Sequence, residues 1–334
     1  MRPYISRVHG LRERRARPAR AVRGGLGIVR EKFDSGADVR RLLGICLLLV
    51  ACSKGQDATS RAPLWPDGAP GALGNDPGDR PELYYYSPPP DKATGVAIVV
   101  APGGSYAHTG GLHFEAFPTA RWLAAQGITA IVLRYRVSND GYHHRDFLAD
   151  GKQAIRTVRA RAAELGVDPH RIGMVGFSAG GHLAAFVGTA CPPSGDPDHS
   201  DPLLRVSCRP DFIVMVYPVV TLDDRWAHQR SKQSLLGPEV PPPIGLEDRL
   251  SLEKQVTPTT PPAFIVHSRR DRKVDVHNSE LFGAAMEAQG RPFELHLYDD
   301  GGHGVGLAQK PAMPGMKQWP AKMQAWLRAI QVLR

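Results

Sequence analysis

One short stretch combines a potential nucleophile with a backbone that would expose it. Residues 176–182 have the sequence Gly-Phe-Ser-Ala-Gly-Gly-His and follow an apolar run at 171–175. A G-x-S-x-G pattern between a strand and a helix is typical of a nucleophile elbow, a sharp, strained turn whose glycines let the two elements approach closely. We therefore predict that Ser178 is a nucleophile. The amide of Ala179, at the start of the helix, would face an oxygen bonded to it.

A base and an acid for this serine follow later, each just beyond an apolar run. Asp271 comes shortly after residues 263–267, and His303, flanked by glycines, follows residues 293–298. The order Ser178, Asp271, His303 is that of the catalytic triad in α/β-hydrolases. In such a triad His303 would take the serine proton during attack on a carbonyl and return it to the leaving group. Asp271 would fix the imidazole tautomer and stabilise its positive form.

The glycine-rich turn at 101–106 offers hydrogen-bond donors for the oxyanion that this reaction would form. It directly follows the apolar run at 96–100. Adjacent glycines let backbone amides point into one concavity, which suits a negative oxygen that develops in a transition state. We expect the amide of Ala179, together with that of Gly104 or Ser105, to form an oxyanion hole. The alternative is a plain tight turn.

Alternating apolar and amphipathic segments predict a scaffold that brings these residues together. Predicted strands cover 82–86, 96–100, 128–135, 171–177, 211–217, 263–267 and 293–298; predicted helices cover 114–126, 145–165, 179–189, 278–289 and 317–333. This alternation predicts an α/β fold of the α/β-hydrolase type, a mostly parallel, doubly wound sheet with helices on both faces. Functional groups in such sheets cluster at the carboxyl ends of the strands, where Ser178, Asp271 and His303 would converge.

The chain divides into three predicted parts. Residues 1–52 form an N-terminal extension, residues 53–80 a flexible tether and lead-in, and residues 81–334 the hydrolase domain. A stretch at about 221–260 is rich in Pro, Ser and charge and predicts a small insertion with short helices. We expect this insertion to set specificity, because loops at the carboxyl edge of a sheet carry function.

The N-terminal extension contains a segment typical of export signals. Residues 40–53 combine a basic flank with a ten-residue apolar core, which is too short to span a bilayer. Leu-Val-Ala-Cys at 49–52 resembles a bacterial lipobox, in which the cysteine is lipidated after cleavage. We expect an exported lipoprotein of the bacterial cell envelope, attached to the membrane only through Cys52. The alternatives are an ordinary secretory signal, hence a secreted protein, or a buried apolar segment. Residues 1–38 are long for a signal, which suggests translation from near Val39.

The formal charge of +9 is concentrated in the same region. Residues 1–51 hold 12 of the 42 lysines and arginines and 4 of the 33 acidic residues, a net charge of +8, so the rest carries only +1. This nearly neutral remainder argues against a nucleic-acid partner. His143 and His144 are adjacent, but nothing near them has the spacing of metal ligands, and we expect no metal site.

Two further cysteines flank a loop. Cys191 and Cys208 bracket a Pro-, Gly- and Asp-rich segment at 192–207. An exported protein folds in an oxidising compartment, so we expect a disulfide between them. The alternative is two unrelated buried thiols.

Motifs across residues 62–330 resemble those of the α/β-hydrolase esterases grouped with feruloyl and acetylxylan esterases, the BD-FAE-like family. The shared motifs are Trp-Pro-Asp-Gly-Ala-Pro-Gly at 65–71, Pro-Gly-Gly-Ser-Tyr at 102–106, His113-x-Glu115, Tyr135-Arg136, Asp150 with Ala154-Ile155-Arg156, the elbow at 176–182, Val266-His267-x-x-x-Asp271-x-x-Val274 and Gly-Gly-His-Gly at 301–304. The resemblance implies a serine esterase that removes acetyl groups from polysaccharide or oligosaccharide and needs neither a metal nor an organic cofactor. Its substrate would be an acylated carbohydrate or another small ester.

The chain departs from the family pattern around the acid. Family members usually have Gly and Asp where this chain has Ser268 and Arg270, and Pro where it has Asp275. Asp275 is therefore a rival for the acid position, although the D-x-x-V spacing favours Asp271.

Two residues near the glycine-rich turn are possible substrate contacts. These are Tyr106 and Glu115; for Glu115 we favour a structural role, in which it holds the turn in place. Other functions also fit the fold, because fold does not set substrate: a peptidase, a small-ester carboxylesterase or a non-catalytic binding protein. A binding protein on this scaffold typically lacks the serine or the histidine, and both are present here.

Overall fold

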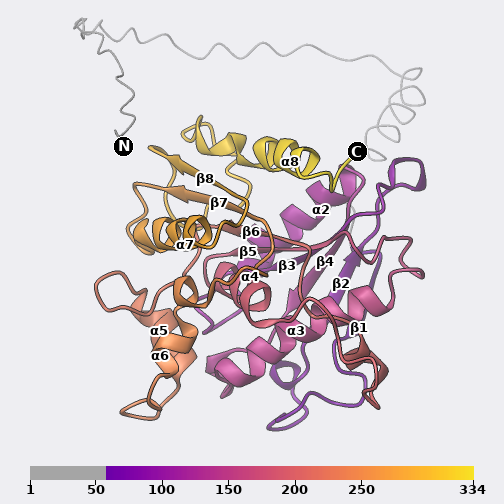
Figure 1. Ribbon diagram of the computed structural model, residues 1–334, viewed down its shortest axis with the longest axis horizontal. Coiled ribbons are helices and arrows are strands. Elements are labelled where there is room, and N and C mark those ends of the chain that lie inside the picture. The colour runs from indigo at the N-terminus through magenta and orange to yellow at the C-terminus, as the bar shows by residue number, and fades with distance from the viewer. Residues whose placement is uncertain (1–57) are drawn as a thin grey trace, which may run out of the picture. The chain divides into compact units, whose positions relative to one another are not determined.

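The computed structural model describes residues 58–334, whose strands form one eight-stranded sheet in the order β1-β2-β4-β3-β5-β6-β7-β8 (Figure 1). The strands are β1 (Ser60–Pro63), β2 (Glu82–Tyr86), β3 (Ala97–Ala101), β4 (Thr129–Arg134), β5 (Ile172–Phe177), β6 (Phe212–Val216), β7 (Ala263–Ser268) and β8 (Phe293–Tyr298). The helices are α2 (Phe117–Ala125), α3 (His144–Ala160), α4 (Ala179–Ala190), α5 (Gln229–Leu236), α6 (Leu246–Leu250), α7 (His277–Ala288) and α8 (Trp319–Ala329), with short turns at η3 (Leu112–Ala116) and η6 (Leu252–Gln255).

The sheet is parallel from β4 to β8 and antiparallel only where β2 joins β1 and β4. Every residue of β3, β5 and β6 is buried, which explains why these strands are continuous apolar runs in the sequence. The chain passes from β3 outward to β4 and then returns to β5 on the other side of β3. The carboxyl ends of β3 and β5 therefore meet at a topological switch point, the usual place for a ligand in such sheets.

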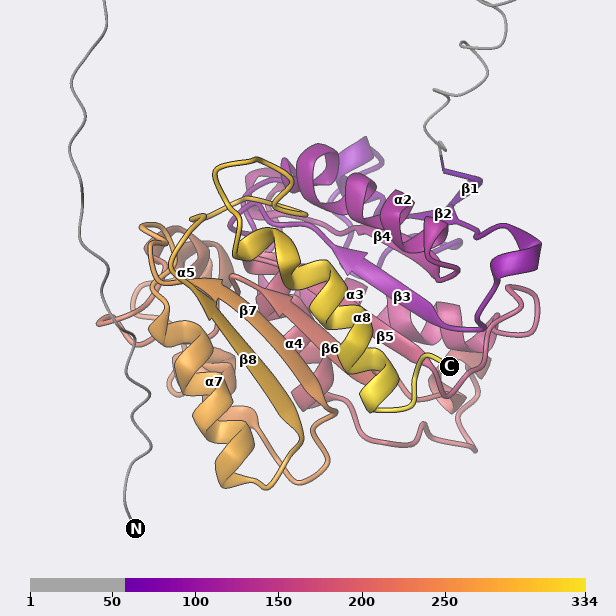
Figure 2. The same cartoon turned by 90° about the horizontal axis from the view of Figure 1, so that it is seen from above.

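Helices cover both faces of this sheet. On one face α2 and α8 pack around the aromatic residues Phe212, Phe264 and Trp326; on the other lie α3, α4 and α7 (Figure 2). The arrangement confirms the α/β-hydrolase fold predicted from the alternation of elements.

The structure differs from the prediction at the start of the domain. Residues 60–80 are not a flexible lead-in: β1 pairs with β2, Leu64 is buried, and the Trp65 indole donates to Asp150 Oδ1 at 2.8 Å. The hydrolase domain therefore includes this segment. Its short strand, Ser-Arg-Ala-Pro, has no apolar alternation, because it is a mostly exposed edge strand held by its pairing with β2.

The segment at 221–260 holds α5, α6 and η6. Leu235 and Leu250 are buried in the same cluster as α3 and α4. The rings of His143 and His144 bond the backbone carbonyls of Ser234 and Leu235, at 3.1 and 2.9 Å, so these histidines join the insertion to α3. Among residues 58–334 no group of three or more His, Cys, Asp or Glu side chains is placed to hold a metal ion.

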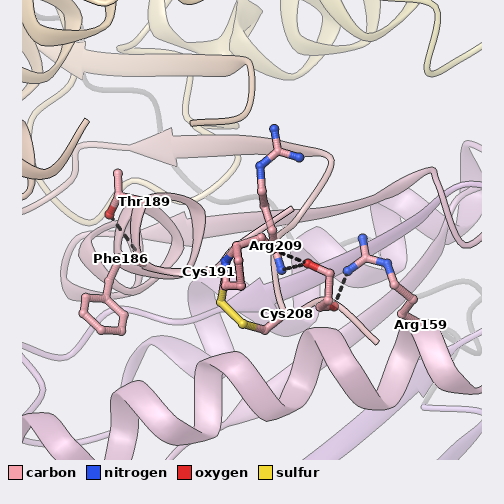
Figure 3. The surroundings of a disulfide bond; sticks show 8 residues. Arg159, Phe186, Thr189, Cys191, Cys208 and Arg209 are labelled. Atoms are coloured by element: carbon pink, nitrogen blue, oxygen red, sulfur yellow. Dashed lines mark hydrogen bonds between the residues drawn. A yellow bond between two sulfur atoms is a disulfide. The ribbon is translucent and has the colours of Figure 1, made fainter. Parts of the chain in front are cut away.

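A disulfide joins Cys191, at the end of α4, to Cys208, which precedes β6. The two Cα atoms lie 5.5 Å apart and both residues are buried. Figure 3 shows the bond with Arg159 and Arg209 nearby; Arg159 Nη1 donates to the carbonyl of Ser207 at 2.6 Å. The disulfide closes the loop at 192–207, and Arg159 joins the end of that loop to α3.

The predicted signal segment, Cys52 and residues 53–57 of the predicted tether lie outside the described residues. Within residues 58–334 no helix is long and apolar enough to cross a membrane.

Candidate active site

Ser178 occupies the turn between β5 and α4, in a backbone conformation that most residues avoid. Its φ and ψ are 53° and −117°, which costs on the order of 1–3 kcal/mol for a residue with a side chain. The turn is held from two sides: the Ser178 amide donates to Val216 at 3.0 Å, and the Ser178 carbonyl accepts from Val219 at 3.1 Å. A Cβ at Gly180 would lie 2.6 Å from the carbonyl oxygen of Pro102, so the elbow requires glycine there.

The structure brings His303 and Asp271 into line with this serine. His303 Nε2 lies 2.8 Å from Ser178 Oγ, and His303 Nδ1 lies 2.7 Å from Asp271 Oδ2. Because a carboxylate can only accept, Nδ1 carries the proton and Nε2 is left to accept the serine hydroxyl. The imidazole therefore has the tautomer that a general base needs.

Asp271 is held as an anion beneath the imidazole. Its side chain is fully buried, its Oδ1 accepts the amides of Lys273 and Val274 at 2.8 and 3.1 Å, and its Oδ2 lies 3.3 Å from His267 Nε2. Burial by itself would raise the pKa of Asp271, but hydrogen bonds from His267, His303 and the Lys273 amide outweigh it and hold the pKa well below its usual range. Asp271 therefore stays charged.

The rival acid Asp275 lies elsewhere. Its carboxylate is about half exposed and accepts the amide of His277 at 2.9 Å and the ring Nδ1 of His277 at 2.6 Å. It thus binds the first residue of α7. The structure brings Asp271 to His303, and does not bring Asp275 there.

The turn after β3 lies directly beside the nucleophile. A Cβ at Gly103 would be 3.0 Å from Ser178 Cβ, and Gly104 and Ser105 have positive φ values of 141° and 58°. Among residues 58–334 no acceptor is bonded to the amides of Gly104, Ser105 or Ala179. The first residue of a helix has no acceptor within the helix, which accounts for Ala179. These are the three predicted oxyanion donors, and their amides are free to bind an oxygen.

Glu115 holds this turn from beneath. It is 2% exposed, and its Oε2 accepts the Gly103 amide at 2.7 Å while its Oε1 accepts the Tyr217 hydroxyl at 3.0 Å. The Tyr217 oxygen in turn accepts the amide of Gly306, three residues beyond His303, at 2.9 Å. One buried carboxylate therefore joins the turn after β3 to the loop that carries His303. Burial raises the pKa of Glu115, and the bonds from Gly103 and Tyr217 oppose that rise.

Tyr106 is buried as well. It has no exposed surface, its ring stacks on Phe147 with a centroid distance of 4.4 Å, and its hydroxyl lies 3.0 Å from His182 Nδ1. The favoured structural role of Glu115, which is to hold the turn, is therefore confirmed. The possible substrate contact of Tyr106 is wrong, because its side chain points into the core. Tyr217 was not predicted; the signal available was an aromatic residue with a polar tip at the end of a buried strand.

A groove reaches His303 from the side of the loop after β8. It has a volume of about 950 Å³ and includes Phe114, Pro118, Arg270, His303, Val305 and Lys310 in its walls; we call it the β8 groove. None of its wall residues comes from the insertion at 221–260, where we expected specificity to lie. The walls come instead from η3, the start of α2 and the loops after β7 and β8.

The fold and the Ser178–His303–Asp271 arrangement define an α/β-hydrolase of the serine-nucleophile class. The model of the BD-FAE family matches residues 83–286, and the chain belongs to this family. The match confirms the resemblance inferred from the motifs.

Esterases are among the proteins that the chain resembles. It is 33% identical over 223 residues to an acetylxylan esterase of Xylanibacter ruminicola, covering 65% of this chain and 42% of that protein. The structure of an acetyl ester-xyloside bifunctional hydrolase from Caldicellulosiruptor lactoaceticus has a TM-score of 0.75 and 41% identity, covering 84% of this chain and 100% of that one. An esterase from Thermogutta terrifontis has a TM-score of 0.65 and 26% identity, covering 84% and 95%. The chain spans about two-fifths of the length of the first curated relatives it matches.

Proposed function

We propose that the protein is a serine carboxylesterase that removes acetyl groups from polysaccharide or oligosaccharide. The observation that carries the proposal is the continuous chain of hydrogen bonds from Ser178 through His303 to the buried Asp271, at 2.8 and 2.7 Å. The free amides beside Ser178 complete the set of groups that acyl transfer needs.

The reaction follows from these contacts. Ser178 Oγ attacks the acetyl carbonyl while its proton passes to His303 Nε2, and the resulting oxyanion is bound by the amides of Ala179 and of Gly104 or Ser105. Collapse breaks the bond to the sugar oxygen, which takes the proton from His303. Water then attacks the acetyl-serine by the same route, and acetate leaves. Asp271 stays ionised and stabilises the imidazolium at each step.

The substrate class is supported by the relatives and by the groove. The names of the Xylanibacter and Caldicellulosiruptor proteins specify acetylxylan and acetyl ester-xyloside hydrolysis, respectively. The β8 groove is large enough for more than an acetyl group. A carboxylesterase for small esters is the second candidate, favoured by the similarity to the Thermogutta esterase, whose structures include propionate-bound and butyrate-bound forms.

The test has two stages. Purified protein and its Ser178→Ala variant are compared in p-nitrophenyl acetate turnover and in labelling by a fluorophosphonate; we expect turnover and labelling in the first and neither in the second. If the unmodified protein shows neither turnover nor labelling, the proposal that it is a serine esterase is wrong. Acetate release from acetylated xylan, measured beside a panel of small esters and peptides, then separates the carbohydrate esterase from the small-ester esterase and the peptidase.

We also propose that the protein is an exported lipoprotein anchored through Cys52. The lipobox-like sequence at 49–52 supports this proposal, and so does the Cys191–Cys208 disulfide, because disulfides persist in oxidising compartments. Expression in a bacterium with labelled palmitate should label the protein but not its Cys52→Ser variant, and the labelled protein should fractionate with membranes. Unlabelled protein in the medium would instead support an ordinary secretory signal.

A further inference from the structure

The β8 groove combines an exposed aromatic ring with two cations close to His303. Phe114 lies in the groove wall and is 54% exposed. It is the only aromatic residue among the exposed large hydrophobic residues of 58–334. It lies next to the His303 loop, since a Cβ at Gly304 would be 3.8 Å from Phe114 Cε2. Its backbone is held in place, because the neighbouring Glu115 carboxylate binds Gly103. An exposed ring on a fixed backbone suits packing against the apolar face of a sugar ring.

The cations of the groove have no partner in the described part of the chain. Arg270 and Lys310 are exposed, and neither the guanidinium of Arg270 nor the ammonium of Lys310 makes a hydrogen bond or an ion pair with residues 58–334. Because Arg270 immediately precedes Asp271, the contacts that hold Asp271 beside His303 also fix the backbone position of Arg270.

The acidic groups near these cations are already bound. Asp300, the one carboxylate in the groove wall, accepts the amides of Gly315 and Met316. The neighbouring Asp299 faces Arg269 at 3.4 Å. The walls of the groove therefore carry a net positive charge beside the site where the ester is cleaved.

We infer that the β8 groove binds an acidic sugar, a uronic acid residue close to the acetylated one, with its ring on Phe114 and its carboxylate on Arg270. This inference rests on the proposed function. A guanidinium binds a carboxylate through two parallel hydrogen bonds, which orients the sugar as well as attracting it. The main chain of a xylan is neutral and has no anionic group to pair with Arg270 or Lys310. A uronic acid branch carries a carboxylate that can pair with them.

The experiment compares two acetylated xylo-oligosaccharides that differ only in a uronic acid branch beside the acetylated sugar. Acetate release gives kcat/KM for each, and their ratio is the readout. We expect the wild type to favour the acidic substrate about tenfold at low salt, with the preference falling as ionic strength rises. Arg270→Gln should bring the ratio close to one, and Phe114→Ala should raise KM for both substrates several-fold.

Arg272→Gln is the matched control, because Arg272 is an exposed arginine of the same loop that is not in the groove wall. It should keep the wild-type ratio. If Arg270→Gln does not fold, as judged by circular dichroism, Lys310→Gln is measured instead. It removes the other positive charge of the groove and should also lower the ratio.

The outcomes separate this inference from the proposed function. A wild-type ratio near one, with normal turnover of p-nitrophenyl acetate and of the neutral oligosaccharide, overturns the acidic-sugar site and leaves the esterase intact. A ratio that persists in Arg270→Gln, or is lost equally in Arg272→Gln, also overturns it. Absence of turnover with p-nitrophenyl acetate refutes the esterase itself.

Discussion

At the scale of single residues, the site depends on which of two nearby aspartates faces the histidine. Asp271 and Asp275 both follow β7, but only Asp271 is buried, is bonded by two backbone amides and lies 2.7 Å from His303. A buried carboxylate is stable when every lone pair facing the protein has a donor. The amides of Lys273 and Val274 and the ring of His267 meet that condition.

Replacing the two aspartates should therefore have unequal effects. Asp271→Asn should lower kcat/KM by about 1,000-fold or more, because an amide beside Nδ1 favours the wrong imidazole tautomer. Asp275→Asn, which affects only the start of α7, should stay within about threefold of wild type. The measurement is hydrolysis of p-nitrophenyl acetate at equal concentrations of folded protein. A larger loss in Asp275→Asn would reverse the assignment.

Glu115 acts on the reaction through the groups that it positions. Glu115→Gln keeps the shape but offers one acceptor oxygen to two donors, the Gly103 amide and the Tyr217 hydroxyl. One donor would face an NH₂ group, at a cost of about 1–3 kcal/mol. We expect kcat to fall roughly 10- to 100-fold while KM changes less than threefold, because the oxyanion turn and the His303 loop lose their common anchor.

Glu253→Gln provides the comparison for this prediction. Glu253 is a half-buried glutamate in η6 that accepts from Thr221 Oγ1 at 2.9 Å. It is far along the chain from both the turn after β3 and the His303 loop. Its substitution should alter stability without lowering kcat. Equal losses of kcat in the two variants would count against a positioning role for Glu115.

At the scale of elements, loops rather than helices or strands assemble the site. The turns after β3 and β5 meet where the strand order reverses, and the loop after β8 is tied to them through Tyr217, just past β6. The elements that carry these loops are held by the buried sheet. Segments at the periphery of the sheet need other restraints, and the disulfide after α4 is one of them.

Removing that disulfide should lower stability without changing the chemistry. A Cys191→Ala, Cys208→Ala double variant loses the restraint on a loop with a sequence separation of 17, for which we expect about 3 kcal/mol in the free energy of unfolding. Urea unfolding with and without a reductant measures the change. The kcat of the folded variant should stay within twofold of wild type, since no catalytic group lies in residues 192–207. A variant as stable as wild type would show that the restraint is redundant.

At the scale of the whole molecule, a buried histidine makes stability depend on pH. His182 lies under the elbow without exposed surface, donates from Nε2 to the carbonyl of Leu250 at 2.9 Å and accepts the Tyr106 hydroxyl at Nδ1. It thereby joins α4, the turn after β3 and the insertion. Burial lowers the pKa of His182 from 6.5 to about 4, against the smaller opposing effect of the Leu250 carbonyl.

The sign of the effect follows from proton binding. Between pH 6.5 and pH 4 the unfolded chain protonates this histidine and the folded protein does not, so stability falls as the pH falls. Between pH 7.5 and pH 5.0 we expect a loss of about 2 kcal/mol in the free energy of unfolding. Asp271, whose folded pKa is lowered, adds to acid instability only below the usual range of aspartate.

Urea unfolding at the two pH values tests this expectation. His182→Gln should show a much smaller difference between pH 7.5 and pH 5.0, whatever its absolute stability. His170→Gln, a substitution at an exposed position, should keep the wild-type difference. Equal stability of the wild type at both pH values would rule out His182 as the sensitive group.

The sequence by itself determined what local patterns encode. Apolar runs without polar interruption identify buried strands, and glycines around Ser178 and His303 mark turns where a side chain would clash, so the strands β2 to β8, the elbow and the order of the triad could be predicted. The predicted bounds of β2 and β8 agree with the structure residue for residue.

Only the tertiary structure decided which side chains meet. Asp271 and Asp275 are both carboxylates and lie four residues apart. Their roles differ because Asp271 contacts His303, in the loop after β8, whereas Asp275 contacts His277 at the start of α7. Tyr106 and Glu115 lie beside the site in sequence but face the core, and β1 exists because it pairs with an edge strand. Local periodicity sets the type of an element, whereas contacts between distant segments depend on how the sheet and its loops pack, and no local pattern records that packing.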